Sequence, residues 1–364
     1  TREELLALKI KPINKKIEKE VKAIWDGIAK PLDGLGEFEL LLARIGGILE
    51  STDLNLQKKA IIAMCADNGI VAEHVSQSGQ EVTAIVTSFM GKQQSSVGKM
   101  AAHAGVDVIP VDIGINSAEK IPGVRDCKIM QGTRDFLEEP AMTEEEALRA
   151  IEVGIQLVQE CKDKGYTLLG TGEMGIGNTT TSSAVAIALM EKDVTDPVVL
   201  ERWIGRGAGL SDAGLQRKAQ VIKSALEKYP VAHMDALQIL ATFGGLDIAG
   251  MAGVCIGGAL YHIPVILDGL ISTLAGLVAQ RLVPGVQEFL IPSHCSKEPA
   301  ARLLADELQL HPVIDANLAL GEGTGAVMMC ELLDLALTLY EKQTTFDTME
   351  IEQYERFSDK DGVR

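Results

Sequence analysis

The chain has 364 residues, of which 46% are hydrophobic, and its mean hydropathy is +0.14. These values exclude an intrinsically disordered chain and allow a sizeable core. The formal net charge of −17 argues against non-specific nucleic-acid binding, which depends on neutralising phosphates.

The cysteines and the apolar runs indicate which compartment and which kinds of site to expect. The six cysteines form no C-x-x-C pair and no zinc-like spacing with histidine, so we expect reduced core thiols, no metal site and a cytoplasmic protein. The N-terminus has no signal-peptide pattern. The longest apolar run, residues 247–260, contains Asp247 and several glycines, so we predict no membrane span.

Taken in chain order, the patterns alternate between helix and strand. Apolar residues at steps of three and four predict a helix over residues 13–28, ending before Pro31. A longer helix is predicted to follow Thr143, which would cap it in a capping box with Glu146. Short apolar runs that end in Gly, Asp, Glu or Ser predict buried strands within residues 58–69, 106–114, 166–175, 264–269 and 289–294.

This alternation predicts a doubly wound, Rossmann-like α/β fold with a parallel sheet. Ligands bind at the carboxyl ends of the strands in such folds. Near the C-terminus, residues 326–343 and 348–357 are predicted to be helices without an intervening strand. We expect three parts: residues 1–30 and 326–364 form a small helical domain from both chain ends, and residues 31–325 form the large catalytic domain.

Three glycine-rich loops are candidate binding segments. "GEMGIGNTTTSSA" (172–184) joins a predicted strand to a predicted helix, and amides at a helix N-terminus attract phosphate. It matches neither G-x-G-x-x-G nor a P-loop, which argues against a dinucleotide-dependent oxidoreductase. "GRGAGLSDAGLQRK" (205–218) places Lys218 after a second such loop. For both segments a tight turn or a solvated helix end is the alternative.

The third loop, "LGEGTGAVMM" (320–329), places Glu322 between glycines before an apolar helix. A carboxylate in a partly dry pocket can act as a general base, whereas an ordinary Glu at this position interacts with the helix dipole. "PSHCSKEPA" (292–300) contains His294 and Ser296. A hydrolase would need a G-x-S-x-G elbow, which the sequence lacks, so a structural histidine is the alternative.

Taken together, these segments resemble the nicotinate-nucleotide–dimethylbenzimidazole phosphoribosyltransferase family of cobalamin assembly. The resemblance extends from about residue 30 to about residue 337. It is carried by "KPLDGLGEFE", "ADNGIVAEHVS", "GQEVT", "GEMGIGNTT", "GRGAGLSDAGLQRK", "GGLDIAGMAG", "PVILDG", "SHCSKEP" and "LGEGTGA". "GEMGIGNTT" together with "LGEGTGA" is the most specific combination.

The resemblance implies a reaction and a set of site residues. The 5-phosphoribosyl group of nicotinate mononucleotide moves to a base such as 5,6-dimethylbenzimidazole, giving α-ribazole 5′-phosphate and nicotinate with inversion at C1. No cofactor is needed. The catalytic positions match Glu322, as general base, and Glu173. The phosphate- and nucleotide-binding positions match Gly175, Gly177, Asn178, Thr179, Gly207, Lys218, Asp268, Gly269 and Ser296, and the base-binding positions match Gln80, Glu81 and Ser88.

The family resemblance also implies a homodimer, and a heterodimer with a paralogue is the alternative. Several positions depart from the family pattern. Ala319 replaces an arginine, Asp33-Gly34 replaces Gly-Ser, Asp247 replaces a glutamate and Gln93-Gln94 replaces a glycine pair. We interpret these as changes on the base side of the site. Two alternatives therefore stay open: a paralogue that uses purine or phenolic acceptors, and a non-catalytic nucleotide-binding subunit, which would not need Glu322.

Overall fold

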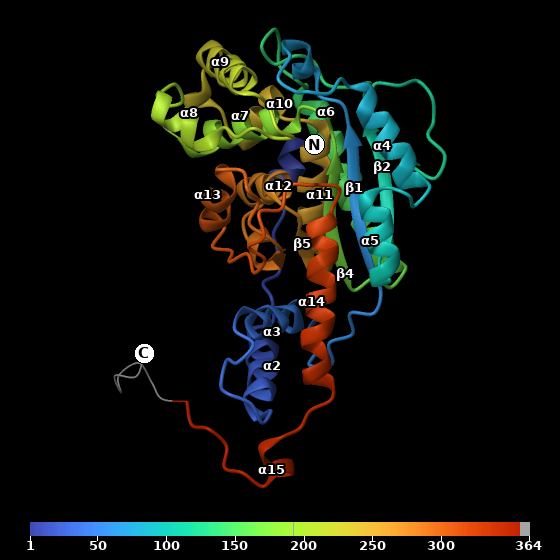
Figure 1. Ribbon diagram of the computed structural model, residues 1–364, viewed down its shortest axis with the longest axis vertical. Helices are drawn as coiled ribbons and strands as arrows, with labels where there is room; N and C mark the ends of the chain where they lie inside the picture. Colours follow the sequence, from blue (N-terminus) through green and yellow to red (C-terminus); the bar gives the residue numbers. More distant parts are fainter. Residues whose placement is uncertain (192, 357–364) are drawn as a thin grey trace.

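The computed structural model describes residues 1–191 and 193–356 (Figure 1). Its centre is a parallel sheet with the strand order β3-β2-β1-β4-β5-β6. The strands are β1 (Lys59–Ala66), β2 (Asp107–Gly114), β3 (Arg125–Asp126), β4 (Leu168–Met174), β5 (Val265–Leu267) and β6 (Leu290–Pro292). The predicted doubly wound, Rossmann-like sheet is therefore confirmed, and all five predicted strands are present.

Helices cover both faces of the sheet, so β1 is buried on both sides. Ile62 and Met64 belong to one apolar core, and Ile61 and Cys65 belong to the other, as the two-residue period of a strand requires. The first core includes side chains from α6 (Glu144–Asp163), α10 (Ala236–Phe243), α11 (Leu246–Tyr261) and α12 (Leu270–Leu282). The second includes side chains from α4 (Glu81–Gly91), α5 (Ser96–Ala104) and α14 (Thr324–Glu341).

The remaining helices gather mainly at the two ends of the molecule. Figure 1 shows α7 (Asn178–Met190), α8 (Pro197–Trp203) and α9 (Asp212–Lys228) together at one end. Further short helices are α1 (Arg2–Leu6), α13 (Ala300–Glu307) and 3-10 turns at Gly69–Glu73, Val231–His233 and Val286–Phe289. The predicted capping box of Thr143 and Glu146 is confirmed at the start of α6. No helix of the described residues has the length and apolar character that crossing a membrane requires.

The opposite end of the molecule brings the two ends of the chain together. There α2 (Lys15–Gly27) and α3 (Glu37–Leu49) pack beside the C-terminal half of α14 (Figure 1). Trp25 and Tyr340 have ring centroids 5.3 Å apart, and Ile28 pairs with Thr345 in an antiparallel bridge. The predicted helix over 13–28 is confirmed as α2. The domain boundaries themselves remain a prediction.

The predicted helix over 348–357 is wrong for most of its length. Only α15 (Phe346–Met349) forms, and residues 350–356 are exposed and have no helical structure. Glu350 takes a left-handed φ of 56° directly after α15, so the helix ends there. The last residue of the predicted helix, Phe357, lies outside the described residues.

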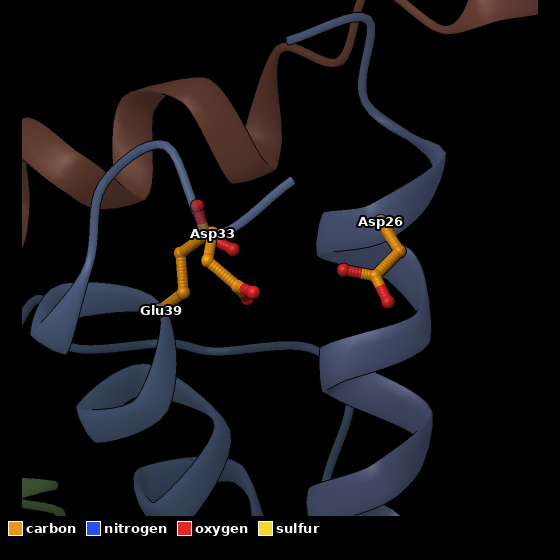
Figure 2. A group of neighbouring side chains, drawn as sticks. All are labelled: Asp26, Asp33 and Glu39. Carbon is orange, nitrogen blue, oxygen red and sulfur yellow. The ribbon is translucent and has the colours of Figure 1, made fainter. Parts of the chain in front are cut away.

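A network of ion pairs joins α2 and α3 to the C-terminal segment. Figure 2 shows three carboxylates that face one another: Asp26 on α2, Asp33 in the loop that follows, and Glu39 on α3. Three basic side chains bridge them: Lys22 lies 3.0 Å from Glu39, Lys30 lies 2.6 Å from the same carboxylate, and Arg356 lies 2.7 Å from Asp33 and 2.8 Å from Asp26. Burial works to raise the pKa of Glu39, but the hydrogen bonds from Lys30, the Leu35 N–H and Lys22 outweigh it and lower that pKa. The cluster is therefore an ion-pair network.

Candidate active site

A cavity of about 280 Å³ opens at the carboxyl ends of β4, β5 and β6. This is the edge of the sheet at which a doubly wound fold binds ligands. Nine of the predicted site residues line it: Glu173, Gly175, Asn178, Thr179, Gly207, Asp268, Gly269, Ser296 and Glu322. The structure thus brings together segments that are far apart in the sequence.

Glu322 lies in an unusual turn at the start of α14. Gly321, Glu322 and Gly323 all have left-handed φ angles, of 84°, 63° and 94°. Glycine tolerates this conformation, whereas a glutamate held in it is strained, and such strain is typical of functional sites. Oε2 of Glu322 accepts a hydrogen bond from the Val97 N–H at 3.0 Å, in the first turn of α5. The carboxylate is therefore seated on the positive end of a helix dipole.

Asp268 holds this turn in place from the end of β5. Its Oδ2 accepts from the Gly323 N–H at 3.1 Å, and its Oδ1 accepts from the N–H groups of Gly325 at 2.7 Å and Ala326 at 3.2 Å. These donors are the amides that a helix N-terminus leaves without partners. Burial raises the pKa of Asp268 and the three N–H groups oppose that rise. Asp268 therefore lines the cavity and also caps α14.

Glu173, Asn178 and Asp247 form a second group beside Glu322. The Asn178 side-chain amide donates to Glu173 Oε2 and to Asp247 Oδ2, the latter at 3.1 Å. A side chain at Gly321 would begin 2.7 Å from Glu173 Oε1, so Glu173 lies against the Glu322 turn. Burial raises the pKa of Glu173 to about 8, and the neighbouring Asp247 carboxylate contributes to that rise. Glu173 is accordingly protonated at neutral pH.

Lys218 lies beneath the second glycine loop instead of facing the cavity. Its side chain is fully buried, and its Nζ donates to Thr179 Oγ1 and to the Gly205 carbonyl, both at 2.9 Å. Burial lowers its pKa to about 8. On the cavity side of the loop, Glu298 Oε1 accepts from the Gly207 N–H at 3.0 Å. Lys218 thus reaches the cavity through Thr179.

The remaining predicted residues lie around the cavity without lining it. Gly177 caps α7 with a φ of 92°. Gln80 donates to the Asn68 carbonyl at 3.1 Å and accepts from the Asn116 amide at 3.1 Å. Glu81 is exposed and Ser88 is half-buried, both on α4. The residue that α4 contributes to the cavity is Val86.

Of the four departures from the family pattern, Asp33-Gly34 and Gln93-Gln94 lie away from the wall of this cavity, and Asp247 accepts a hydrogen bond from Asn178, which lines it. Asp33 belongs to the ion-pair network, with Gly34 beside it. Gln93 and Gln94 form the turn between α4 and α5, where Gln93 takes a left-handed φ of 57°. Ala319 does line the cavity, at its exposed rim.

The cavity has an unusual charge balance. The described residues lining it include Glu173, Asp268, Glu298 and Glu322 but no lysine or arginine. An anionic group in this cavity would meet backbone amides, which the N-termini of α7 and α12 supply without a side-chain cap, and uncharged side-chain donors such as Thr179 and Ser296. Those acidic side chains that are ionised favour positive charge elsewhere in the ligand. The predicted site residues did not include Val86, which has no recognisable motif around it, or Glu298, which lies within the "SHCSKEP" segment.

A Rossmann-like sheet with uncapped helix N-termini at a cavity beside the strand ends is an arrangement that binds anionic ligands such as nucleotides. A family model described as phosphoribosyltransferase matches residues 10–351. The nicotinate-nucleotide–dimethylbenzimidazole phosphoribosyltransferase of Clostridium acetobutylicum is 40% identical and covers 95% of this chain and 96% of its own length. The one from Acetivibrio thermocellus is 41% identical, with 91% and 92% covered.

Solved structures agree with these relatives. The crystal structure of CobT from Thermus thermophilus superimposes with a TM-score of 0.85 at 32% identity, covering 93% of this chain and all of that one. The chain is therefore a pentosyltransferase, and it belongs to the nicotinate-nucleotide–dimethylbenzimidazole phosphoribosyltransferase family.

Proposed function

We propose that this enzyme transfers the 5-phosphoribosyl group of nicotinate mononucleotide to a lower-ligand base such as 5,6-dimethylbenzimidazole. The products are α-ribazole 5′-phosphate and nicotinate. The two named relatives carry this donor and this acceptor in their names, and the similarity extends over nearly the whole of each chain. The uncapped N-terminus of α7 after the 172–178 loop is suited to the 5′-phosphate.

The reaction needs one base and little acid assistance. A nitrogen of the benzimidazole forms a bond to C1 of the ribose from the face opposite nicotinate. The bond from C1 to the pyridinium nitrogen breaks, and its electron pair stays on nicotinate, which leaves. The N–H proton of the attached benzimidazole then passes to Glu322. Positive charge that develops at C1 is favoured by the Glu322 carboxylate.

The observation that carries this proposal is the seating of Glu322. One carboxylate oxygen is held by the Val97 N–H, and Oε1 has no hydrogen-bond partner among the described residues. The side chain therefore has a fixed orientation and a free oxygen for a proton. A nucleotide-binding subunit without catalysis would gain nothing from a strained glutamate on the cavity wall. Glu173, which is protonated, is proposed to position this turn.

The test is to incubate the purified chain with nicotinate mononucleotide and an acceptor panel. Benzimidazoles, adenine, phenol and p-cresol are offered together and separately, and mass spectrometry identifies the products. We expect α-ribazole 5′-phosphate as the main product. Products formed only with adenine or the phenols would replace the benzimidazole acceptor. If the chain bound the nucleotide but transferred no phosphoribosyl group to any acceptor, the alternative of a non-catalytic nucleotide-binding subunit would be supported.

The alternative acceptors are favoured by one observation at the cavity rim. Ala319 and Leu320 line the cavity where the family pattern has an arginine followed by leucine. A small side chain at position 319 leaves this part of the rim without the positive charge that the family's arginine would supply. An acceptor that differs from dimethylbenzimidazole in its polar groups is the second candidate for that reason.

A homodimer is the proposed assembly, and a heterodimer with a paralogue is the alternative. Large apolar side chains are exposed on two helices of the same face of the sheet: Ile85 and Phe89 on α4, and Leu335 and Leu339 on α14. Ile85 and Phe89 lie one turn apart on α4, as Leu335 and Leu339 do on α14, and paired exposed apolar side chains of this kind favour protein contact. Light scattering on the purified chain should give twice the monomer mass. A monomer that dimerises only with added paralogue would support the heterodimer.

A further inference from the structure

His294 lies on the cavity wall with one ring nitrogen fixed. Its Nδ1 is 3.1 Å from Ser293 Oγ. The Ser293 hydroxyl is also 2.6 Å from the Leu267 carbonyl and close to the Asp268 carbonyl. A hydroxyl has a single hydrogen and a carbonyl can only accept, so that hydrogen points to the carbonyls. Ser293 Oγ therefore accepts from Nδ1–H, and Nε2 keeps its lone pair.

The charge state of His294 agrees with this tautomer. Its side chain is 5% exposed, and burial lowers the pKa of His294 to about 4. The imidazole is therefore neutral at neutral pH. Asp268 Oδ1, at 4.0 Å from Nδ1, likewise favours the proton on Nδ1. A neutral ring with a bare Nε2 accepts hydrogen bonds and does not attract phosphate or carboxylate groups.

The surroundings of Nε2 match a hydroxyl group. Nε2 lies over Gly269, where a Cβ would be only 2.9 Å away. Gly269 precedes the first turn of α12, and Leu270, Ile271 and Ser272 of that turn line the cavity. First-turn amides are donors without helical partners. A hydroxyl bound here would donate to Nε2 and accept from an amide, whereas a phosphate dianion has no hydrogen to donate to Nε2.

His294 also lies close to the reacting end of the cavity. Asp268, its neighbour, caps α14 directly after Glu322. On the proposed function, Glu322 faces the ribose C1, and the hydroxyl next to C1 is the 2′-hydroxyl. We infer that His294 Nε2 accepts a hydrogen bond from the 2′-hydroxyl of the phosphoribosyl group and makes the enzyme select ribose over 2′-deoxyribose. This inference rests on the proposed function, because it takes the phosphoribosyl group as the ligand.

Ser296 is the polar side chain that competes for this role. Its Cβ is 3.9 Å from the position of a Cβ on Gly269, and its hydroxyl accepts weakly from the Glu298 N–H at 3.4 Å. Ser296 is half-buried on the same wall. It therefore offers a matched control, since its removal changes the wall without touching His294.

The experiment compares kcat/KM for nicotinate mononucleotide, its 2′-deoxy analogue and its 3′-deoxy analogue. The enzymes are wild type, His294→Leu, His294→Gln and Ser296→Ala. Each result is expressed as a ratio of two substrates on one preparation, so the fraction of folded enzyme cancels. The intrinsic reactivity of the deoxy sugars cancels when ratios are compared between enzymes.

We expect His294→Leu to reduce the preference for ribose over 2′-deoxyribose by about tenfold, as loss of one hydrogen bond in a desolvated site would. His294→Gln, whose amide oxygen reaches a similar position, should restore part of it. Ser296→Ala should leave the ratio within about twofold, and the 3′-deoxy ratio should stay constant in all four enzymes.

An unchanged 2′-deoxy ratio in His294→Leu would overturn the inference, as would a collapse of that ratio in Ser296→Ala. A loss confined to the 3′-deoxy substrate would also overturn it. In each of these cases turnover of nicotinate mononucleotide by the wild type leaves the proposed function standing. Absence of that turnover would overturn the proposed function and this inference with it.

Discussion

Glu322 and Val97 are joined by a hydrogen bond of 3.0 Å from the backbone of one helix to the carboxylate that precedes another. The two residues are 225 positions apart in the sequence. The bond occupies Oε2 and orients the side chain in its strained turn. An amide in place of the carboxylate can keep this bond through its oxygen but cannot take up a proton.

Glu322→Gln should therefore separate catalysis from folding. We expect kcat to fall by about 10² to 10⁴, the usual contribution of a general base, with the melting temperature nearly unchanged. Steady-state kinetics with nicotinate mononucleotide and dimethylbenzimidazole measure the first, and thermal unfolding measures the second. Glu331→Gln, at an exposed position of α14, is the control. A rate within about threefold of the wild type would show that the proton goes elsewhere.

Glu173→Gln should change how stability depends on pH. The pKa of Glu173 is raised from 4.5 to about 8 in the folded protein, so the folded state holds a proton that the unfolded state has released between these values. Its contribution to stability is complete below pH 4.5 and is lost as pH rises through 8. The wild type should therefore lose free energy of unfolding as pH rises from about 5 to 8. The variant lacks this titrating group, so its loss over the same range should be smaller than that of the wild type by about 2–4 kcal/mol.

Urea unfolding of both proteins at pH values of about 5, 6.5 and 8 measures this difference. Glu152→Gln, at an exposed position of α6, is the control and should follow the wild type. Parallel curves for Glu173→Gln and the wild type would mean that Glu173 is ionised throughout.

Much of this fold can be predicted because its strands are short apolar runs that end in polar loops. β1 and β4 are clear in the sequence for this reason. β3 gives no such signal, since it has only two residues and both are exposed. The helix expected at 348–357 is wrong because local apolar spacing alone does not bury a face. Residues 350–356 are exposed, so nothing offsets the cost of ordering them.

The site can be predicted only as far as its side chains are exceptional in sequence. Glu322 between glycines is such a case. The Val97 N–H is a backbone donor on a distant helix, and no residue type signals it. Lys218 is expected to contact phosphate, but a basic side chain on α9 gives no indication in sequence of which side of a loop it will pack. Glu298 joins the site only because the segment after β6 meets the 205–210 loop in space.

Thr179→Val and Lys218→Met should weaken nucleotide binding to different extents. Lys218 supports Thr179 and the Gly205 carbonyl from below, so its loss leaves two groups without a partner. We expect Lys218→Met to raise the KM for nicotinate mononucleotide by about tenfold or more and to lower stability by about 1–3 kcal/mol. Thr179→Val removes one hydroxyl from the cavity and should raise the same KM less, with the KM for the acceptor unchanged.

Kinetics with each substrate varied in turn distinguish the two effects. Lys223→Met is the control, since Lys223 lies further along α9 and pairs only with Glu227, at 3.9 Å, among the described residues. If Lys218→Met altered the acceptor KM alone, the loop of residues 205–210 would belong to the acceptor side of the cavity.

The departures Asp33 and Ala319 should behave differently when the residues of the family pattern are restored. Asp33 has a φ of 55° and is half exposed within the ion-pair network. Asp33→Gly removes ion pairs that contribute little at a surface, and glycine adopts the left-handed conformation without strain. The free energy of unfolding should therefore change by less than about 1 kcal/mol. Both KM values should stay constant. Ala319→Arg places a cation at the rim of a cavity whose described lining has none, and should shift the acceptor KM severalfold. Competition between dimethylbenzimidazole and adenine in one reaction measures that shift directly. If Asp33→Gly changed the acceptor preference and Ala319→Arg did not, the α2–α3 segment would determine which acceptor is used.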